Sequence, residues 1–242
     1  MILVRGVLFN LLFFGFTLVL GLAGMPAFLF GTRPVLAIAR FWSRSVLALA
    51  RVVAGIDVEL RGAENLPKGA AIVAAKHQSA WETLYFTELL DAPAAVLKQE
   101  LVRAPIVGPY FRALNMIPVD RKAGAAALRQ MVEGGRAAVA AGRPILIFPQ
   151  GTRVAPGTKA PYHPGTAALY TGLDLPVIPV ALNSGMYWSR NAFWKTPGRI
   201  IVEVLPAIPP GLNRKAFMAR LEETLETATA RLEEEARGTT AS

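Results

Sequence analysis

His77 and Glu82 stand where a strongly apolar run, residues 71–75, gives way to polar residues. An imidazole held at one nitrogen by a carboxylate keeps its other nitrogen free to take a proton from an attacking hydroxyl group. A spacing of five places two residues about 140° apart on a helix, so His77 must precede the helix if the two side chains are to meet. The pair predicts general-base catalysis, and a purely structural histidine is the alternative.

A helix start lies between these two residues. The segment Ser79–Glu82 matches the S-x-x-E capping box, in which Ser79 caps the helix and Glu82 sits in its first turn. Capping alone would explain Glu82. The same geometry, however, brings the carboxylate back towards the turn that carries His77, so both interpretations are compatible.

A second polar cluster follows the apolar run 144–148 and ends at Arg153. Gly151 shapes a turn, Thr152 offers a hydroxyl group, and the arginine fork can hold a phosphate through paired, charge-assisted hydrogen bonds. We expect an anion site here. An ordinary turn at the end of a strand, with a solvated arginine, is the alternative.

Arg121 ends a further short strand, and it could converge with Arg153 on one anion. Asp120 could pair with either arginine. The apolar run 177–180 leads into a polar turn and could border a groove for an acyl chain. For His163, which has no carboxylate nearby in sequence, a structural role or a place at the edge of the substrate is favoured.

Short apolar runs alternate with longer amphipathic ones after Gly55, which is typical of an α/β fold with a mixed central sheet of about seven strands flanked by helices. Strands are predicted at residues 57–61, 71–75, 95–98, 116–119, 145–148, 177–181 and 200–205. Helices are predicted at 82–90, 122–141, 165–171 and 214 to about 237.

The composition points to a membrane. Hydrophobic residues make up 53% of the 242 and charged residues 18%, against about 45–50% and 25% in ordinary globular domains. Cysteine is absent, which excludes disulfides and a cysteine nucleophile, and two distant histidines predict no metal site. The net charge is +9, yet no nucleic-acid-binding motif accompanies it, so anionic lipid is the expected partner.

Residues 6–32 carry no charge, and as a helix they would run about 40 Å against a hydrocarbon core of about 30 Å. A cleaved secretory signal is the alternative. A second, interfacial helix is predicted at 34–55, with Arg40, Arg44 and Arg51 near one face. A spanning helix and a hairpin within one leaflet both fit. We therefore expect membrane-anchoring helices at 1–56 and a catalytic α/β domain at 57–242, on the cytoplasmic side of the inner membrane.

Taken in order, these clusters resemble the four motif blocks of the glycerolipid acyltransferase superfamily, and in particular bacterial 1-acyl-sn-glycerol-3-phosphate acyltransferases. The family's H-x4-D pair corresponds to His77 and Glu82. Its phosphate-binding arginines correspond to Arg121 and Arg153, and its Gly-Thr turn to Gly151 and Thr152. Residues expected in supporting roles are Ser79, Lys98 and Gln150.

The resemblance implies transfer of an acyl group from acyl-CoA or acyl carrier protein to the sn-2 hydroxyl of 1-acylglycerol 3-phosphate, with no cofactor. Another acceptor, glycerol 3-phosphate or a lyso-aminolipid, is an alternative, and so is an inactive lipid-binding protein. Glu82 replaces the family's usual aspartate, and Gln150 replaces the glutamate of F-P-E-G-T-R. Lys76 stands where the family often has asparagine.

Overall fold

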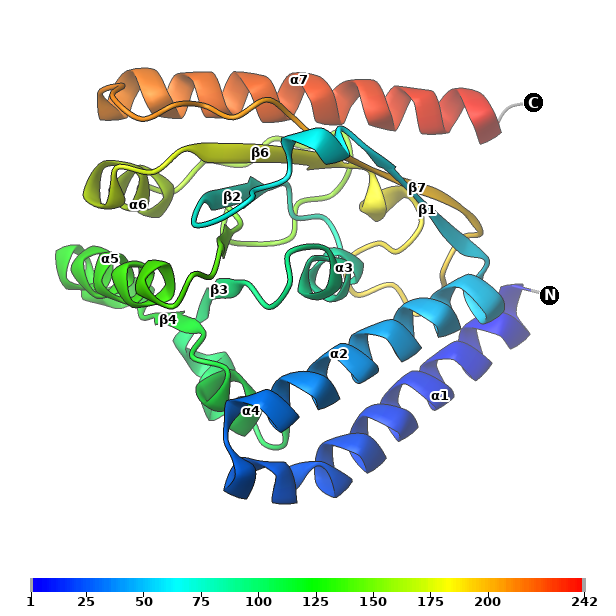
Figure 1. Cartoon of the computed structure of the whole chain (residues 1–242). Coiled ribbons are helices and arrows are strands. Elements are labelled where there is room, and N and C mark those ends of the chain that lie inside the picture. The colour runs from blue at the N-terminus through cyan, green and yellow to red at the C-terminus, as the bar shows by residue number, and fades with distance from the viewer. Residues whose placement is uncertain (1, 241–242) are drawn as a thin grey trace.

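Seven runs of aliphatic residues form one sheet, in the order β1-β7-β6-β2-β5-β3-β4. The computed structural model describes residues 2–240 and is shown in Figure 1. The strands are β1 (Ile56–Arg61), β2 (Ile72–Ala75), β3 (Ala94–Lys98), β4 (Ile117–Val119), β5 (Ile145–Ile147), β6 (Val177–Leu182) and β7 (Gly198–Val204). The predicted α/β class and the mixed seven-stranded sheet are confirmed.

Five neighbouring strands point the same way. β6, β2, β5, β3 and β4 pair in parallel, whereas β7 runs antiparallel to β6 and parallel to β1. The carboxyl ends of the five parallel strands therefore meet at one edge of the sheet, where open α/β sheets bind their ligands.

Helices cover both faces of this sheet, as Figure 1 shows, with α7 along one face and α1 to α3 on the other. The helices are α1 (Ile2–Ala23), α2 (Thr32–Leu49), α3 (Trp81–Leu89), α4 (Val107–Ala113), α5 (Ala125–Ala140), α6 (Gly165–Leu173) and α7 (Arg214–Thr240). Short helical turns join them, of which η1 (Met25–Phe30) and the π-helical η2 (Ala50–Ala54) flank α2.

Strand β2 shows how the two faces are built. Successive side chains of a strand point to opposite faces. Val73 and Ala75 join the core beneath α1, α2 and α3, whereas Ile72 and Ala74 join the core beneath α5, α6 and α7. A strand buried on both faces reads as a continuous apolar run, which is why this central strand was easy to predict.

The N-terminal helices α1 and α2 lie side by side and antiparallel (Figure 1). Phe9 of α1 is buried against Trp188, with ring centroids 5.0 Å apart. The outward side of α1 is apolar and exposed, as Leu11, Phe14 and Val19 illustrate. Residues 3–23 are long and apolar enough to cross a membrane, judged by length and composition.

The arginines of the second helical segment pair with carboxylates of the α/β domain. Arg40 pairs with Asp91, Arg44 with Glu88, and Arg51 with Asp57. These three arginines therefore have counter-charges on the protein itself, while Arg44 and Arg51 keep 71% and 74% of their side-chain surface exposed. Such exposed pairs contribute little stability each, about 0–1 kcal/mol.

Candidate active site

The imidazole of His77 lies against the carboxylate of Glu82, with Nδ1 2.8 Å from Oε1. A carboxylate can only accept a hydrogen bond, so Nδ1 donates and Nε2 is left as the proton-accepting nitrogen. The His77 side chain is 16% exposed and that of Glu82 is fully buried. Residues 76–79 form no regular structure and Ala80 is a bend, so the chain between β2 and α3 allows the two side chains to meet despite their spacing of five.

Glu82 is held by the backbone as well as by the imidazole. Its Oε1 accepts from the N–H groups of Gln78 and Ser79, both at 2.7 Å, and its Oε2 accepts from Ser184 Oγ at 2.7 Å. The contact of Glu82 with the Ser79 N–H that a capping box requires is therefore formed, but α3 begins at Trp81, and Ala80 takes the N-cap position that was predicted for Ser79. Ser79 Oγ accepts from the Trp81 N–H at 3.1 Å, not from Glu82, so the hydroxyl contact falls one residue earlier than the motif specifies.

The ring of His77 stacks on Phe148, with centroids 4.0 Å apart and planes 19° from parallel. Its carbonyl oxygen accepts from the Val154 N–H at 2.8 Å. Both contacts come from the segment that follows β5. The turn expected to bind an anion thus lies directly beside the histidine.

Arg121 reaches that same turn and donates from Nη2 to the carbonyl oxygen of Gly151. Gly151 has φ +60°, and a Cβ atom there would lie 2.6 Å from Arg121 Nη2 and 3.1 Å from His163 Cδ2. His163, for which a structural role or a place at the substrate edge was predicted, is exposed and its ring lies at this turn. A glycine is required because the backbone is left-handed and the side chains of Arg121 and His163 crowd this position.

A further arginine, which the sequence analysis missed, lies on the other side of the turn. Arg190 Nη1 donates to the Arg153 carbonyl at 3.2 Å and to Thr152 Oγ1 at 3.3 Å. The side chain of Arg153 is half-buried in the same turn. Arg190 lies eight residues after the end of β6, beyond the short helical turn Ser184–Met186, so its place in the sequence does not mark it as a residue at a strand end.

Two further residues that the sequence placed near the site, Asp120 and Lys98, lie at this edge of the sheet. Within residues 2–240 Asp120 forms no ion pair with an arginine; its carboxylate accepts from the Lys122 N–H at 2.9 Å and caps a short helical turn. Lys98 is exposed and ends β3, where it pairs with Val119 of β4, two residues before Arg121. It therefore lies at the same edge of the sheet as His77 and Arg121.

The two unexplained departures, Lys76 and Gln150, are both buried. Lys76 Nζ lies 2.6 and 2.8 Å from the two carboxylate oxygens of Glu226 in α7, and Gln150 Nε2 donates to the same carboxylate at 3.3 Å. Tyr162 donates to Glu226 at 2.8 Å. Burial first, and then this hydrogen bond, raise the pKa of the Tyr162 phenol well above its usual value.

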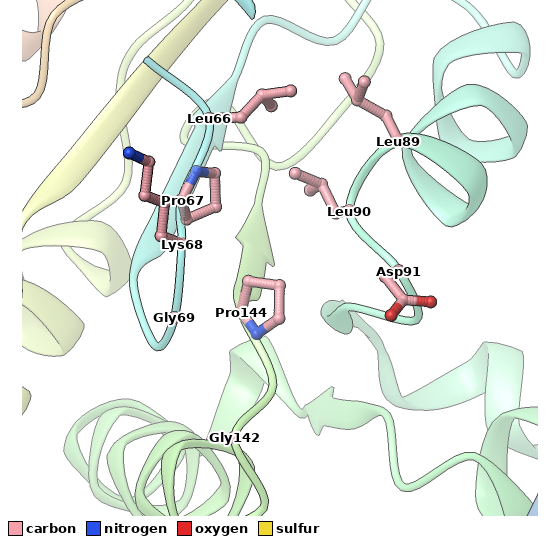
Figure 2. A pocket seen from close by; sticks show the side chains of 9 residues that line it. All are labelled: Leu66, Pro67, Lys68, Gly69, Leu89, Leu90, Asp91, Gly142 and Pro144. Atoms are coloured by element: carbon pink, nitrogen blue, oxygen red, sulfur yellow. The ribbon is translucent and has the colours of Figure 1, made fainter. Parts of the chain in front are cut away.

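A separate cavity, shown in Figure 2, lies at the opposite edge of the sheet. Its apolar lining comes from Leu66, Leu90 and Pro144, with Lys68 and Asp91 at the side. Pro144 precedes β5, whereas the anion-binding turn follows it. This cavity is therefore distant from the histidine and is not where the proposed reacting groups meet.

Comparison with known proteins identifies the family of the chain. The family model described as Acyltransferase matches residues 57–183, which include the histidine, the arginine turn and the end of β6. The chain is 39% identical over 167 residues to the 1-acyl-sn-glycerol-3-phosphate acyltransferase of Pseudomonas aeruginosa, covering 69% of this chain and 65% of that protein. It is 31% identical over 169 residues to 1-acyl-sn-glycerol-3-phosphate acyltransferase alpha of Mus musculus, covering 68% and 59%.

The alignments thus span about three fifths of the length of these two relatives. Among solved structures, that of the 1-acyl-sn-glycerophosphate (LPA) acyltransferase PlsC from Thermotoga maritima resembles the chain with a TM-score of 0.74 and 22% identity. That similarity covers 96% of this chain and 98% of the other, and it concerns the fold. With a family model matching more than half of its length, the chain belongs to the acyltransferase family.

Proposed function

We propose that this protein transfers a fatty acyl group from acyl-CoA or acyl carrier protein to the sn-2 hydroxyl of 1-acyl-sn-glycerol 3-phosphate, which yields phosphatidic acid. The observation that carries the proposal is the His77–Glu82 pair, with Nδ1 2.8 Å from Oε1, set beside a turn flanked by arginines. A base next to an anion site suits a substrate that carries a hydroxyl group and a phosphate.

In this mechanism Nε2 of His77 removes the proton from the sn-2 hydroxyl, and the oxygen attacks the thioester carbonyl carbon. The new C–O bond forms, the C–S bond breaks, and the leaving thiolate takes up the proton held by the His77 imidazolium, which returns the base to its neutral form. Glu82 holds the ring in the required tautomer and stabilises the imidazolium that forms. No acyl-enzyme intermediate is needed.

The phosphate of the acceptor is assigned to Arg121, Arg153 and the Gly151–Thr152 turn. The contact of Arg121 with the Gly151 carbonyl supports this assignment, because it holds the guanidinium group against the turn. Arg190, on the other side of the same turn, adds a cation close to Thr152. Several fixed cations at one turn lower the free energy of a bound dianion without moving to meet it.

Residues 1–56 are proposed to anchor the catalytic domain, residues 57–242, on the cytoplasmic side of the inner membrane. The exposed apolar side of α1 and the exposed Leu29 and Phe30 of η1 support this. They would bring the site to the surface where a lysophospholipid resides. Flotation of the full chain with phospholipid vesicles tests it, and Leu29→Asp with Phe30→Asp should weaken recovery in the lipid fraction.

To test the function, the whole chain is purified in detergent. It is then given labelled 1-acylglycerol 3-phosphate together with acyl-CoA or with acyl carrier protein as the acyl donor. Products are separated by acyl position, and glycerol 3-phosphate and lysophosphatidylethanolamine are offered as other acceptors. We expect sn-2 acylation of the phosphate-bearing lysolipid and none with His77→Ala. Equal turnover of an acceptor without the phosphate monoester would reject the acceptor, and lipid binding without thiol release would reject the enzyme.

A further inference from the structure

The two residues that flank His77 face the opposite way from it. In an extended segment successive side chains alternate in direction. His77 faces α3, where it meets Glu82, so Lys76 and Gln78 face α7. Both are buried, with 2% and 0% of their surface exposed. A lysine that is almost wholly buried needs a counter-charge close by.

Glu226 of α7 supplies that counter-charge. Its carboxylate lies 2.6 and 2.8 Å from Lys76 Nζ, and it also accepts from Tyr162 Oη at 2.8 Å and from Gln150 Nε2 at 3.3 Å. One carboxylate therefore joins the segment after β2, the turn after β5 and the segment before α6. These are the segments that carry His77, Gly151 and His163.

The positive charge of Lys76 is matched by the single negative charge of Glu226, and Gln150 adds no charge to this pair. Gln150 is neutral, so it donates to Glu226 without competing with it for Lys76. Its Oε1 is buried and has no hydrogen-bond partner within residues 2–240. A glutamate at position 150 would place a second carboxylate beside Glu226, which is unfavourable in a dry site. Lys76, Gln150 and Glu226 thus form one balanced set, which accounts for both departures from the family pattern.

A second glutamate of α7, Glu233, binds Gln78, the residue on the other side of His77. Gln78 Nε2 donates to Glu233 Oε1 at 2.6 Å, and the Gly157 N–H donates to Glu233 Oε2 at 2.7 Å. Glu226 and Glu233 are seven residues apart, about two helical turns, so they lie near the same face of α7. The helix therefore holds the residues on both sides of His77.

We propose that Glu226 is a positioning residue for His77: through Lys76 and Gln150, α7 fixes the histidine segment relative to the anion-binding turn. The expected effect on kcat rests on the proposed function, because it is measured as acyl transfer. It assigns no direct contact between Glu226 and substrate. It predicts that loss of the carboxylate leaves a buried, uncompensated ammonium group that loosens both segments.

The test compares Glu226→Gln with Glu223→Gln, which removes the same charge from an exposed position of the same helix. Both full-length proteins are assayed in detergent with the acyl-transfer assay, corrected for the folded fraction. Backbone hydrogen exchange is followed by mass spectrometry in peptides covering residues 73–83 and 146–155. For Glu226→Gln we expect kcat to fall about 10- to 100-fold with KM for the lysophospholipid within about twofold, and faster exchange in both peptides.

The double variant Lys76→Gln, Glu226→Gln tests the coupling, because it removes both charges and keeps amide groups able to hydrogen-bond. It should regain most of the lost turnover and slow the exchange again. The proposal is overturned if Glu226→Gln has the same hydrogen exchange and the same kcat per folded molecule as Glu223→Gln. It is also overturned if the double variant has a kcat no higher than that of Glu226→Gln. If the wild-type protein shows no acyl transfer, the proposed function is wrong. The comparison of hydrogen exchange then still decides whether α7 holds the segment that carries His77.

Discussion

Ser184 at the end of β6 donates to Glu82 Oε2 at 2.7 Å, so the turn after one strand fixes the carboxylate that orients the histidine after another. The other oxygen of Glu82 accepts from two backbone N–H groups and faces His77 Nδ1. All of these partners are on the sheet edge where the parallel strands end. The orientation of the proposed base is thus set by two strand ends and the start of α3.

Weakening this chain of contacts should lower kcat in graded steps. We expect Glu82→Gln to reduce kcat by about 10²- to 10⁴-fold, because an amide presents an N–H group to donors and cannot stabilise an imidazolium. Ser184→Ala should cost about tenfold, because one restraint is lost and the carboxylate remains. Steady-state kinetics on folded protein measure both values.

Thr87→Ala is the matched control for Ser184→Ala, since it removes a hydroxyl group from the exposed side of α3 that bonds only within the helix. It should leave kcat unchanged. A Ser184→Ala enzyme with wild-type kcat would show that the hydrogen bond to Glu82 does not affect the base.

Arg121 should govern binding of the acceptor and not the chemical step. Its guanidinium lies at the Gly151 carbonyl, beside the turn and not at His77. For Arg121→Gln we expect KM for lysophosphatidate to rise about 10- to 100-fold with a smaller change in kcat, because a charge-assisted contact worth about 1.5–3 kcal/mol is lost. Arg190→Gln should act in the same direction but more weakly.

The exposed Arg129 of α5 provides the control, and Arg129→Gln should leave KM unchanged. Binding of an acceptor without a phosphate should be insensitive to all three substitutions. If Arg121→Gln lowers kcat alone and leaves KM as it was, Arg121 acts on the transition state and its assignment to the ground-state phosphate is wrong.

Gly151→Ala should damage both the turn and the arginine beside it. The φ of +60° disfavours any Cβ, and the added atom would lie 2.6 Å from Arg121 Nη2. We expect a loss of about 1–2 kcal/mol in the free energy of unfolding together with a rise in KM. Gly142→Ala is the matched control: its φ is +69° and nothing lies within 4 Å of the added Cβ. It should lose stability in the same range while KM stays at the wild-type value.

Much of the fold could be predicted because its central strands β2, β5 and β6 are buried along their whole length. Runs such as residues 72–75 and 177–182 are continuous aliphatic segments, and the observed bounds agree with the predicted ones to within about two residues. Helix α4 (Val107–Ala113) was missed. It has seven residues, and it contains Gly108 and Pro109, which are typical of turns.

The site was predictable to the extent that it depends on strand ends. His77, Arg121 and Gly151 each follow a strand, and the parallel order brings them to one edge. The partners from α7 could not be predicted in this way. Glu226 is one of several glutamates on α7, and its contact with Lys76 joins residues 150 positions apart in sequence. Only tertiary packing brings such a pair together.

Tyr162 should affect how stability changes at alkaline pH. Its folded-state pKa is raised above the ordinary value of 10.0, first by burial and then by its hydrogen bond to Glu226. Below about pH 10 the phenol is protonated in both states, and its contribution to stability is fully present. Above that pH the unfolded chain releases the proton while the folded chain retains it, so the free energy of unfolding falls as pH rises.

Tyr162→Phe removes this dependence along with the hydrogen bond. We expect the variant to be less stable than wild type at pH 8 by about 1 kcal/mol, and the difference to shrink as pH rises above 10. Denaturant unfolding in detergent at a series of pH values measures both curves, and the titrations of the other tyrosines are common to the two proteins. Curves that stay parallel above pH 10 would show that the Tyr162 phenol ionises equally well in the folded and unfolded states, and that its contact with Glu226 does not hold the proton.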